Sequence, residues 1–199
     1  FVVALIVGMV GILLGYAISR KRRSFAAKSL SALSFIPYLI PALSFGATYY
    51  ALTYNEGFRW LNGTFLLVVL VASVKFLPFA SRSGTNAMMQ LSTEIEEAGI
   101  MLGVPWRKRM SKILFPIQKS SFLSGYLLPF ISTMREYTLF ALIAPVGSLL
   151  TLLIRDFDTS GVSQIANGLN FIMMIVIIVL NFLINKITGA SIDKGIGGN

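Results

Sequence analysis

Long uncharged hydrophobic runs alternate with short polar segments along the chain. Residues 1–18 carry no charged side chain and end at the basic run Arg20–Arg23. Four further runs are apolar enough to be membrane spans: residues 31–53, 64–79, 117–134 and 169–185. A helix rises about 1.5 Å per residue, so runs of this size match a hydrocarbon layer of about 30 Å. The pattern predicts an all-α polytopic membrane protein with about five transmembrane helices.

Two of the apolar segments should depart from a straight helix. Pro37 and Pro41 interrupt the second run and should kink it, because each removes a backbone donor and crowds the preceding turn. Residues 137–154 could be counted as a sixth span, but Pro145 and Gly147 break their middle. We therefore expect a broken, partly re-entrant segment that packs on protein, where its backbone groups find partners.

Composition narrows the range of functions. The chain of 199 residues is 55% hydrophobic and 13% charged, and it contains no cysteine and no histidine. Disulfides, zinc sites with Cys or His ligands, and Cys or Ser–His nucleophiles are thus excluded. The sequence has no GxxxxGK[ST] phosphate-binding loop, so the chain is not itself an ATPase. We interpret Asp156 and Asp158 as solvated acids of a polar loop, and predict no enzyme activity, no catalytic residue, no metal site and no cofactor.

The basic residues divide unequally between the two sides of a five-span protein. One set of loops holds Arg59, Arg135 and Arg155 only. The other set holds the thirteen remaining residues whose loop side can be assigned, namely Arg20, Lys21, Arg22, Arg23, Lys28, Arg82, Arg107, Lys108, Arg109, Lys112, Lys119, Lys186 and Lys194. Lys and Arg accumulate on the cytoplasmic side. The net charge of +9 therefore indicates membrane orientation rather than nucleic-acid binding, and it places the stretch from residue 80 to residue 116 and the C-terminus in the cytoplasm. Lys75, near the end of the third span, is long enough to reach the interface by snorkelling.

The large polar stretch of residues 81–116 contains signals for a short helix. Thr93 and Glu96 have the spacing of a capping box, and Glu94, Glu96 and Glu97 lie where the helix dipole favours carboxylates. Gly103 should supply the left-handed stop, after which Pro105 opens a second short helix.

The face of this helix leaves two interpretations open. Ile95, Ala98 and Leu102 form a narrow apolar stripe, which something must bury because so short a helix is marginal alone. The helix could rest on lipid headgroups, with the Arg107-Lys108-Arg109 cluster attracted to anionic lipid. It could instead dock into a groove on a cytoplasmic partner. The acids favour docking, because an anionic leaflet would repel them.

At this stretch the sequence resembles a known family. Glu97-Ala98-Gly99, then Gly103, and finally Ile113-Leu114-Phe115-Pro116, have the spacing of the EAA loop of binding-protein-dependent ABC-transporter permeases. The family pattern is E-A-A-x3-G-x9-I-x-L-P, so Gly99 replaces an alanine and Phe115 a leucine. The resemblance implies a MetI-like permease core and gives the loop the role of a coupling helix, with Glu97, Ala98, Gly99, Gly103, Ile113 and Pro116 as its coupling residues.

The same resemblance implies the partners and the cargo. The partners would be an ATP-binding cassette subunit, a second permease half and a periplasmic binding protein, all at the bacterial inner membrane. Arg135-Glu136, within residues 134–138, and the stretch 149–157 look most like iron(III)-type permeases, so ferric iron is the expected solute. Thiamine, polyamine, phosphonate or oxyanion are the alternatives. Arg135 and Glu136 would be gate or pathway residues, or a pair held at the outer interface for structure.

Two further expectations concern the whole chain. Residues 1–199 are interpreted as a single permease domain and, since Phe1 lies inside an apolar run, as a fragment or as one half of a larger permease, the C-terminal half. The alternative of another class is an ATP-independent carrier or channel, which would need buried carboxylates or a ring of filter residues.

Overall fold

The computed structural model describes residues 1–145 and 147–188, and every regular element in this part of the chain is helical. The long helices are α1 (Val2–Arg20), α2 (Phe25–Leu39), α3 (Ala42–Leu52), α4 (Phe65–Met89), α7 (Phe115–Arg135) and α10 (Ser163–Thr188). The short ones are η1 (Arg59–Leu61), α5 (Thr93–Met101), α6 (Trp106–Arg109), the π turn η2 (Met110–Leu114), α8 (Phe140–Ile143) and α9 (Leu150–Thr159). The predicted all-α class is confirmed.

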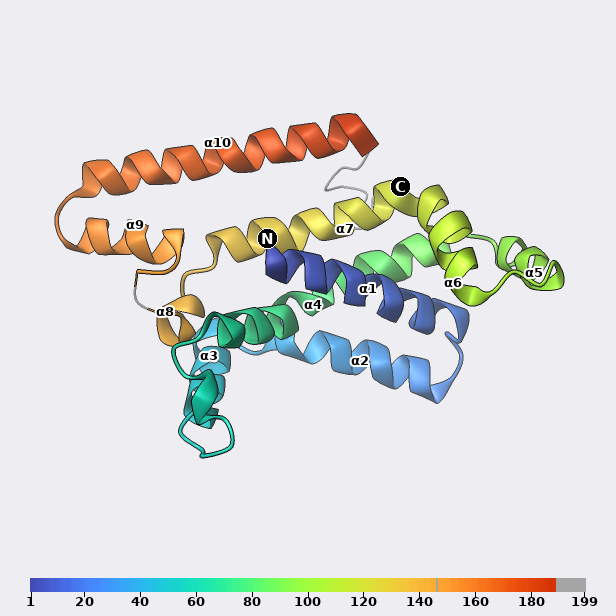
Figure 1. Ribbon diagram of the computed structural model, residues 1–199, viewed down its shortest axis with the longest axis horizontal. Coiled ribbons are helices and arrows are strands. Elements are labelled where there is room, and N and C mark those ends of the chain that lie inside the picture. Colours follow the sequence, from blue (N-terminus) through green and yellow to red (C-terminus); the bar gives the residue numbers. More distant parts are fainter. Residues whose placement is uncertain (146, 189–199) are drawn as a thin grey trace.

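The core is a layer of helices that run side by side (Figure 1). α1 packs on α4, and α7 packs on both of them. α2 covers α1 and α4, while α8 closes the core against α3 and α4. The short helices α5 and α6 lie at one end of this layer, whereas α3, η1, α8 and α9 lie toward the other end (Figure 1).

Fewer helices are long and apolar enough to span a membrane than the five spans that the hydrophobic runs predicted. Among the described residues three helices are long and apolar enough to cross a membrane, namely α1, α4 and residues 163–183 of α10, and the bent pair α2–α3 can make a fourth. The predicted run 117–134 does form a 21-residue helix, α7. Its Lys119 and its serines lower its hydropathy, and it buries Ser121 and Ser124 against neighbouring helices.

Several boundaries differ from the expected ones. α4 continues to Met89, ten residues past the predicted end at residue 79, and Pro78 lies inside it without ending it. The start of the predicted loop 81–116 is therefore helix. The reason is burial, since Ser81, Ser83 and Gly84 pack inside the bundle despite their polarity.

The predicted kink of the second run is confirmed, and the bend is large enough to divide the run into two helices. α2 passes through Pro37, ends at Leu39, and meets α3 at an angle of 99° just before Pro41. The break leaves carbonyl groups without helical partners. The Nζ atom of Lys75 donates to the carbonyl oxygens of Pro37, at 3.0 Å, and of Ile40. Lys75 thus caps the broken helix, and that it reaches the interface by snorkelling stays a prediction.

The predicted break in residues 137–154 is also confirmed. α8 ends at Ile143 and α9 begins at Leu150, and Leu139 is fully buried beside α8. That the segment is re-entrant stays a prediction. The expectation of a polar loop at Asp156 and Asp158 is wrong, because both lie in α9, where Asp158 pairs with Arg155 at 3.5 Å on an exposed face.

The backbones of α1 and α4 touch through glycines. A Cβ atom built on Gly15 would lie 2.2 Å from the carbonyl carbon of Gly84, and one on Gly84 would lie 2.4 Å from the carbonyl oxygen of Gly11. Small residues allow such close approach between membrane helices. α1 and α4 therefore form the tightest contact of the layer and should move as one body.

We predict that Gly15→Ala separates these two helices. The new methyl group meets backbone rather than a movable side chain, so unfolding should be easier by about 3 kcal/mol, the upper end for an overpacked core. The midpoint of thermal unfolding in detergent checks this. Gly168→Ala in α10, where nothing lies within 4 Å, is the matched helical control and should not lower the midpoint. An equal loss in both variants would contradict the close contact.

Candidate functional site

The helix α5 lies beyond the ends of α1 and α4, at the tip of the molecule (Figure 1). Its N-cap is Ser92, whose hydroxyl accepts a hydrogen bond from the Glu94 N–H at 3.2 Å. Thr93 is the first helical residue, so the predicted capping box of Thr93 and Glu96 is wrong. The serine hydroxyl meets the same need one residue earlier. Glu96 is thereby free to turn toward the bundle.

The predicted left-handed stop at Gly103 is confirmed. Its φ is +68°, its N–H donates to the Ile100 carbonyl at 2.9 Å, and the Val104 N–H donates to the Gly99 carbonyl at 2.9 Å. These two bonds make a Schellman motif, which satisfies the last carbonyls of the helix. Pro105 then stands at the N-cap of α6, as predicted. α5 is thus fixed at both ends.

Glu96 is the buried centre of the site. Its side chain keeps 8% of its exposure, and its Oε2 lies 2.6 Å from Nε of Arg20 at the end of α1. Its Oε1 accepts a hydrogen bond from the Tyr16 hydroxyl, and Nη2 of Arg109 lies 3.8 Å from the same atom. A carboxylate removed from water needs such replacement partners. Glu96 therefore ties α5 to α1 and to the segment after α6.

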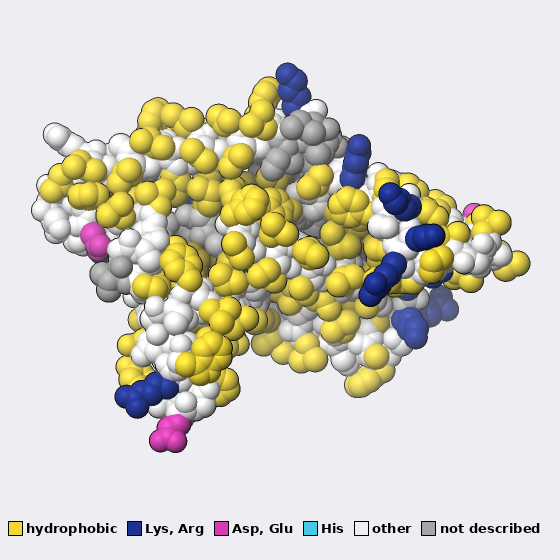
Figure 2. Space-filling view, viewed as in Figure 1, with side chains coloured by type: hydrophobic (Ala, Val, Ile, Leu, Met, Phe, Trp, Pro, Cys, Tyr) yellow, Lys and Arg dark blue, Asp and Glu magenta, His cyan; other side chains and the backbone are white. Residues whose placement is uncertain are grey.

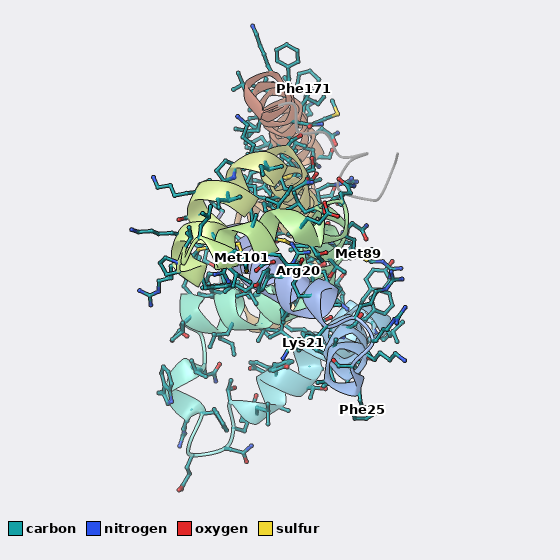
Figure 3. All side chains as sticks on the ribbon, turned by 90° about the vertical axis from the view of Figure 1, so that its right-hand side faces the viewer. Arg20, Lys21, Phe25, Met89, Met101 and Phe171 are labelled. Atoms are coloured by element: carbon teal, nitrogen blue, oxygen red, sulfur yellow. The ribbon has the colours of Figure 1, made fainter. Side chains whose placement is uncertain are left out.

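Aromatic rings and a second arginine contact complete this cluster. The ring of Trp106 meets the ring of Tyr16 edge-on at 5.9 Å, and the Arg20 guanidinium lies 5.9 Å above the same Tyr16 ring. Nη1 of Arg109 donates to the Val104 carbonyl at 2.6 Å. We name Tyr16, Arg20, Glu96, Trp106 and Arg109 the Glu96 cluster. Figure 3 looks at this end of the molecule and shows Arg20 behind α5 and its labelled Met101.

The glycine that departs from the family pattern lies under this cluster. Gly99 is buried, and a Cβ atom there would lie 2.9 Å from Cδ of Arg109 and 3.7 Å from Cδ1 of Ile113. Arg109 is held by Glu96 and by the Val104 carbonyl, so it has little room to yield. The position thus favours glycine over alanine because Arg109 crosses the helix.

The predicted coupling residues divide between inner and exposed positions. Gly99 and the half-buried Ile113 face the bundle. Glu97 and Ala98 are exposed, as are Gly103 and Pro116, the latter at the start of α7. The structure therefore separates an inner set of contacts from an outward-facing set.

The exposed surface of α5 and its C-cap carries large apolar side chains beside Glu94 and Glu97. Met101 is 87% exposed and Leu102 81%, and Ile100 and Ile95 are exposed beside them. We call Ile95, Ile100, Met101 and Leu102 the apolar tip. The predicted stripe through Ile95, Ala98 and Leu102 is consequently uncovered in this chain. Exposed apolar groups gathered on one short helix are typical of an interaction surface.

Arg135 and Glu136 lie at the opposite end of α7 and do not form an ion pair within the described residues. Oε1 of Glu136 accepts a hydrogen bond from the Leu139 N–H at 2.9 Å and so caps the turn that leads into α8. Arg135 lines a cavity of about 440 Å³ between α7, α9 and α10, together with Arg155, Asp158 and Asn170. Glu136 thus has a structural contact, while Arg135 faces a polar cavity.

The members of the Glu96 cluster were not recognisable as a site in the sequence. Tyr16 and Arg20 read as the end of an apolar span, and Trp106 and Arg109 as a basic segment. Complementary charge between Arg20 and Glu96 was the available signal, but the two residues are far apart in the chain and each has other oppositely charged residues to pair with. The fold alone selects the pair.

We predict that Glu96→Gln loosens α5. The amide leaves two buried guanidinium groups without a carboxylate, which should destabilise the cluster by about 3 kcal/mol. Hydrogen exchange of the amides of residues 93–103 measures this, and exchange should become faster. Glu94→Gln, on an exposed carboxylate of the same helix, is the control and should change exchange little. Unchanged protection in Glu96→Gln would show that the cluster does not hold the helix.

The chain is 25% identical over 133 residues to the ferric transport system permease protein FbpB of Actinobacillus pleuropneumoniae, and 28% identical over 125 residues to a putative ferric transport system permease protein FbpB 1 of Haemophilus influenzae. These matches cover 67% and 62% of this chain, and 19% of each relative, so the chain spans about a fifth of the length of these relatives.

The fold also matches a solved structure. An inward-facing MetNI methionine ABC transporter chain superposes with a TM-score of 0.77 at 17% identity, over 94% of this chain and 88% of that one. At this identity the likeness shows the fold, which is the predicted MetI-like permease core. The family model for the binding-protein-dependent transport system inner membrane component matches residues 9–193. The chain therefore belongs to the family of binding-protein-dependent transport system inner membrane components.

Proposed function

We propose that this chain is the permease subunit of an ABC importer in which a separate subunit hydrolyses ATP and acts on the membrane helices through α5. The observation that carries the proposal is the two-sided construction of α5. Its inner face is pinned by the buried Glu96 cluster, while Glu97 and the apolar tip project outward.

The contacts define a path for mechanical coupling. A displacement of α5 acts on Arg20 of α1 through Glu96, and α1 contacts α4 backbone to backbone at Gly15 and Gly84. A helix capped at both ends transmits displacement, whereas a flexible loop would absorb it. Movement imposed on α5 would therefore reach the two helices at the centre of the layer.

The outward face suits a groove on a protein partner better than a lipid surface. Exposed apolar side chains on a short helix are the anchors of helix-in-groove recognition. Glu94 and Glu97 are exposed on the same helix, and an anionic leaflet would repel both carboxylates. The partner implied by the family is the ATP-binding cassette subunit.

The distribution of cations supports the proposed orientation. Most of the Lys and Arg side chains visible in Figure 2 gather around α5, α6 and the turn between α1 and α2. The segment between α3 and α4, which contains η1, carries Glu56 and Arg59 as its charged residues. Since Lys and Arg accumulate on the cytoplasmic side, we propose that α5 faces the cytoplasm. The predicted cytoplasmic C-terminus includes residues 189–199, which lie outside the described residues.

We propose that α10 meets either lipid or a second permease half. Only 6% of its apolar stretch is buried within the chain, and Phe171 and Phe182 are well exposed. The relatives are about five times as long as the matched segment, which leaves room for a second permease half in the same polypeptide.

Ferric iron is the solute we propose, on the strength of the ferric transport relatives. Iron would be cargo handed over by a binding protein. Uptake of labelled ferric iron into proteoliposomes with the partner subunits tests the assignment, with thiamine, polyamine, phosphonate and oxyanion as the alternative substrates. Uptake of one of these in place of iron would overturn the choice of solute and leave the permease assignment standing.

We predict that Glu97→Lys weakens binding of the ATP-binding subunit by at least about tenfold, because it reverses a charge at the centre of the proposed interface. Retention of that subunit during purification measures the effect, together with uptake. Glu56→Lys, an exposed glutamate in the loop between α3 and η1, makes the same charge change far from α5 and should leave retention unchanged. Full retention and uptake in Glu97→Lys would count against the coupling role of α5.

We also propose that Arg135 lines the solute pathway through the cavity between α7, α9 and α10. Arg135→Gln should lower the uptake rate about tenfold or more while the ATP-binding subunit stays bound, because the change removes a charge from the cavity and leaves α5 intact. Arg59→Gln, in the exposed η1 loop, is the control. Equal uptake by both variants would assign Arg135 a structural role at the end of α7.

A further inference from the structure

A basic cavity lies beside the Glu96 cluster, between α1, α2 and α4. Its volume is about 570 Å³. Its wall is built by the C-terminal ends of α1 and α4 and by the first half of α2. These are the ends of the helices near α5, and Figure 3 views this end of the molecule, with Lys21, Phe25 and Met89 labelled around it.

Three cations from three different elements border this cavity. Arg22 comes from the turn after α1, Lys28 from the first turn of α2, and Arg82 from α4. No acidic residue lines the cavity, and none of the three cations has an ion-pair partner within 4.0 Å among the described residues. The Arg82 guanidinium lies 5.6 Å from the centre of the Phe35 ring, which holds it at the wall. The cavity therefore carries positive charge that nothing in the described chain neutralises.

Hydroxyl groups lie between the cations. Ser31, Ser34, Ser81 and Thr85 line the cavity. Oγ of Ser34 and Oγ of Ser81 are 3.4 Å apart across the α2–α4 interface, so they bring two small hydrogen-bonding groups to one spot. Ser34 donates to the Ser31 carbonyl, Ser81 to Ser34 and Thr85 to the Ser81 carbonyl, so these hydroxyls add polar surface to the wall. The donors available to an anion are the arginine and lysine groups, which are the ordinary partners of a phosphate group.

Besides the polar Ser19 and Asn86, the wall includes apolar side chains. Ile18, Pro78 and Met89 line the cavity, while Phe25 and Leu33 on α2 are 86% and 62% exposed next to it. A small soluble anion would gain no binding energy from these apolar side chains. A molecule with an anionic head and hydrocarbon tails matches both parts, since its tails can lie along α2 in the hydrocarbon layer.

We infer that this cavity binds the phosphate headgroup of an anionic phospholipid from the leaflet on the same side of the membrane as α5. Basic pockets between transmembrane helices on the cytoplasmic side are suited to such headgroups, because they add local charge pairing to the attraction of the leaflet. The inference rests on the proposed orientation. It gives the lipid a place between α2 and the α1–α4 pair, where it fills the space that the side chains leave open.

The test compares lipids and two variants of equal charge. The purified transporter with its partner subunits is transferred to nanodiscs of phosphatidylcholine with 10 to 20 per cent phosphatidylglycerol (about the range in which competition is measurable), and co-purifying lipid is quantified. The site variant is Arg22→Gln with Lys28→Gln and Arg82→Gln. The matched variant is Arg107→Gln with Lys108→Gln and Lys112→Gln. It removes an equal number of positive charges from the same end of the molecule.

The expected result is that the wild type and the matched variant retain phosphatidylglycerol preferentially, while the site variant loses at least about tenfold of that preference. Equal loss in both variants would overturn the inference, because the attraction would then be diffuse. Displacement of the lipid by millimolar inorganic phosphate would also overturn it, since a free anion would then be the ligand. Arg82→Gln alone should lose part of the preference and serves if the triple variant does not fold.

This outcome is separable from the proposed function. Lipid retention is measured without ATP and without solute, so it can hold in a preparation that fails the uptake assay. Loss of uptake in Glu97→Lys with unchanged lipid retention would support coupling and the lipid site independently.

Discussion

A carboxylate beneath a protein surface keeps its charge only where cations and hydrogen-bond donors replace the water it has lost. Glu96 meets that condition through Arg20, Tyr16 and Arg109, which come from two different segments of the chain. The two arginines in turn depend on Glu96, since it is the carboxylate that both guanidinium groups face. These contacts fix the position of α5 relative to α1. Because α5 is held in this orientation, Glu97 and the apolar tip point outward.

The same arrangement explains how a short helix can act on a layer of membrane helices. α5 alone has nine residues, too few for a stable isolated helix. Its stability comes instead from the serine N-cap, the Schellman motif at its C-terminal end and the buried carboxylate of Glu96. Behind it, α1 and α4 approach so closely at Gly15 and Gly84 that neither can slide past the other without strain. At the other end of the layer, Lys75 holds the broken α2–α3 pair by its free carbonyls, so the bend is also fixed by a specific contact.

Local signals in the sequence were sufficient for much of the fold. Hydrophobic run length predicts α1 and α10, proline spacing predicts the break between α2 and α3, and Gly103 predicts its own left-handed turn. Signals that depend on distant partners were misleading. Glu96 has the spacing of a capping box with Thr93 but is drawn inward by Arg20, and α4 runs past Pro78 because α1 and α7 bury the small polar residues beyond it. The outward set at the site, Glu97 and Ala98, follows the family spacing, whereas the inner cluster could not be predicted, because no local pattern states which of several arginines a buried glutamate will meet.

The most direct test of rigid coupling is the distance between α5 and α1 in the two nucleotide states. The chain contains no cysteine, so a thiol-reactive spin label attaches only to cysteines that are introduced. Two exposed positions suit such labels, Glu94→Cys in α5 and Leu13→Cys in α1. Double electron–electron resonance on the assembled transporter would then compare the nucleotide-free and ATP-bound states. Coupling through Glu96 predicts the same mean distance and the same width in both states while uptake proceeds. A shift of several ångströms, about the rise of one helical turn, or a broad distribution in either state would contradict it.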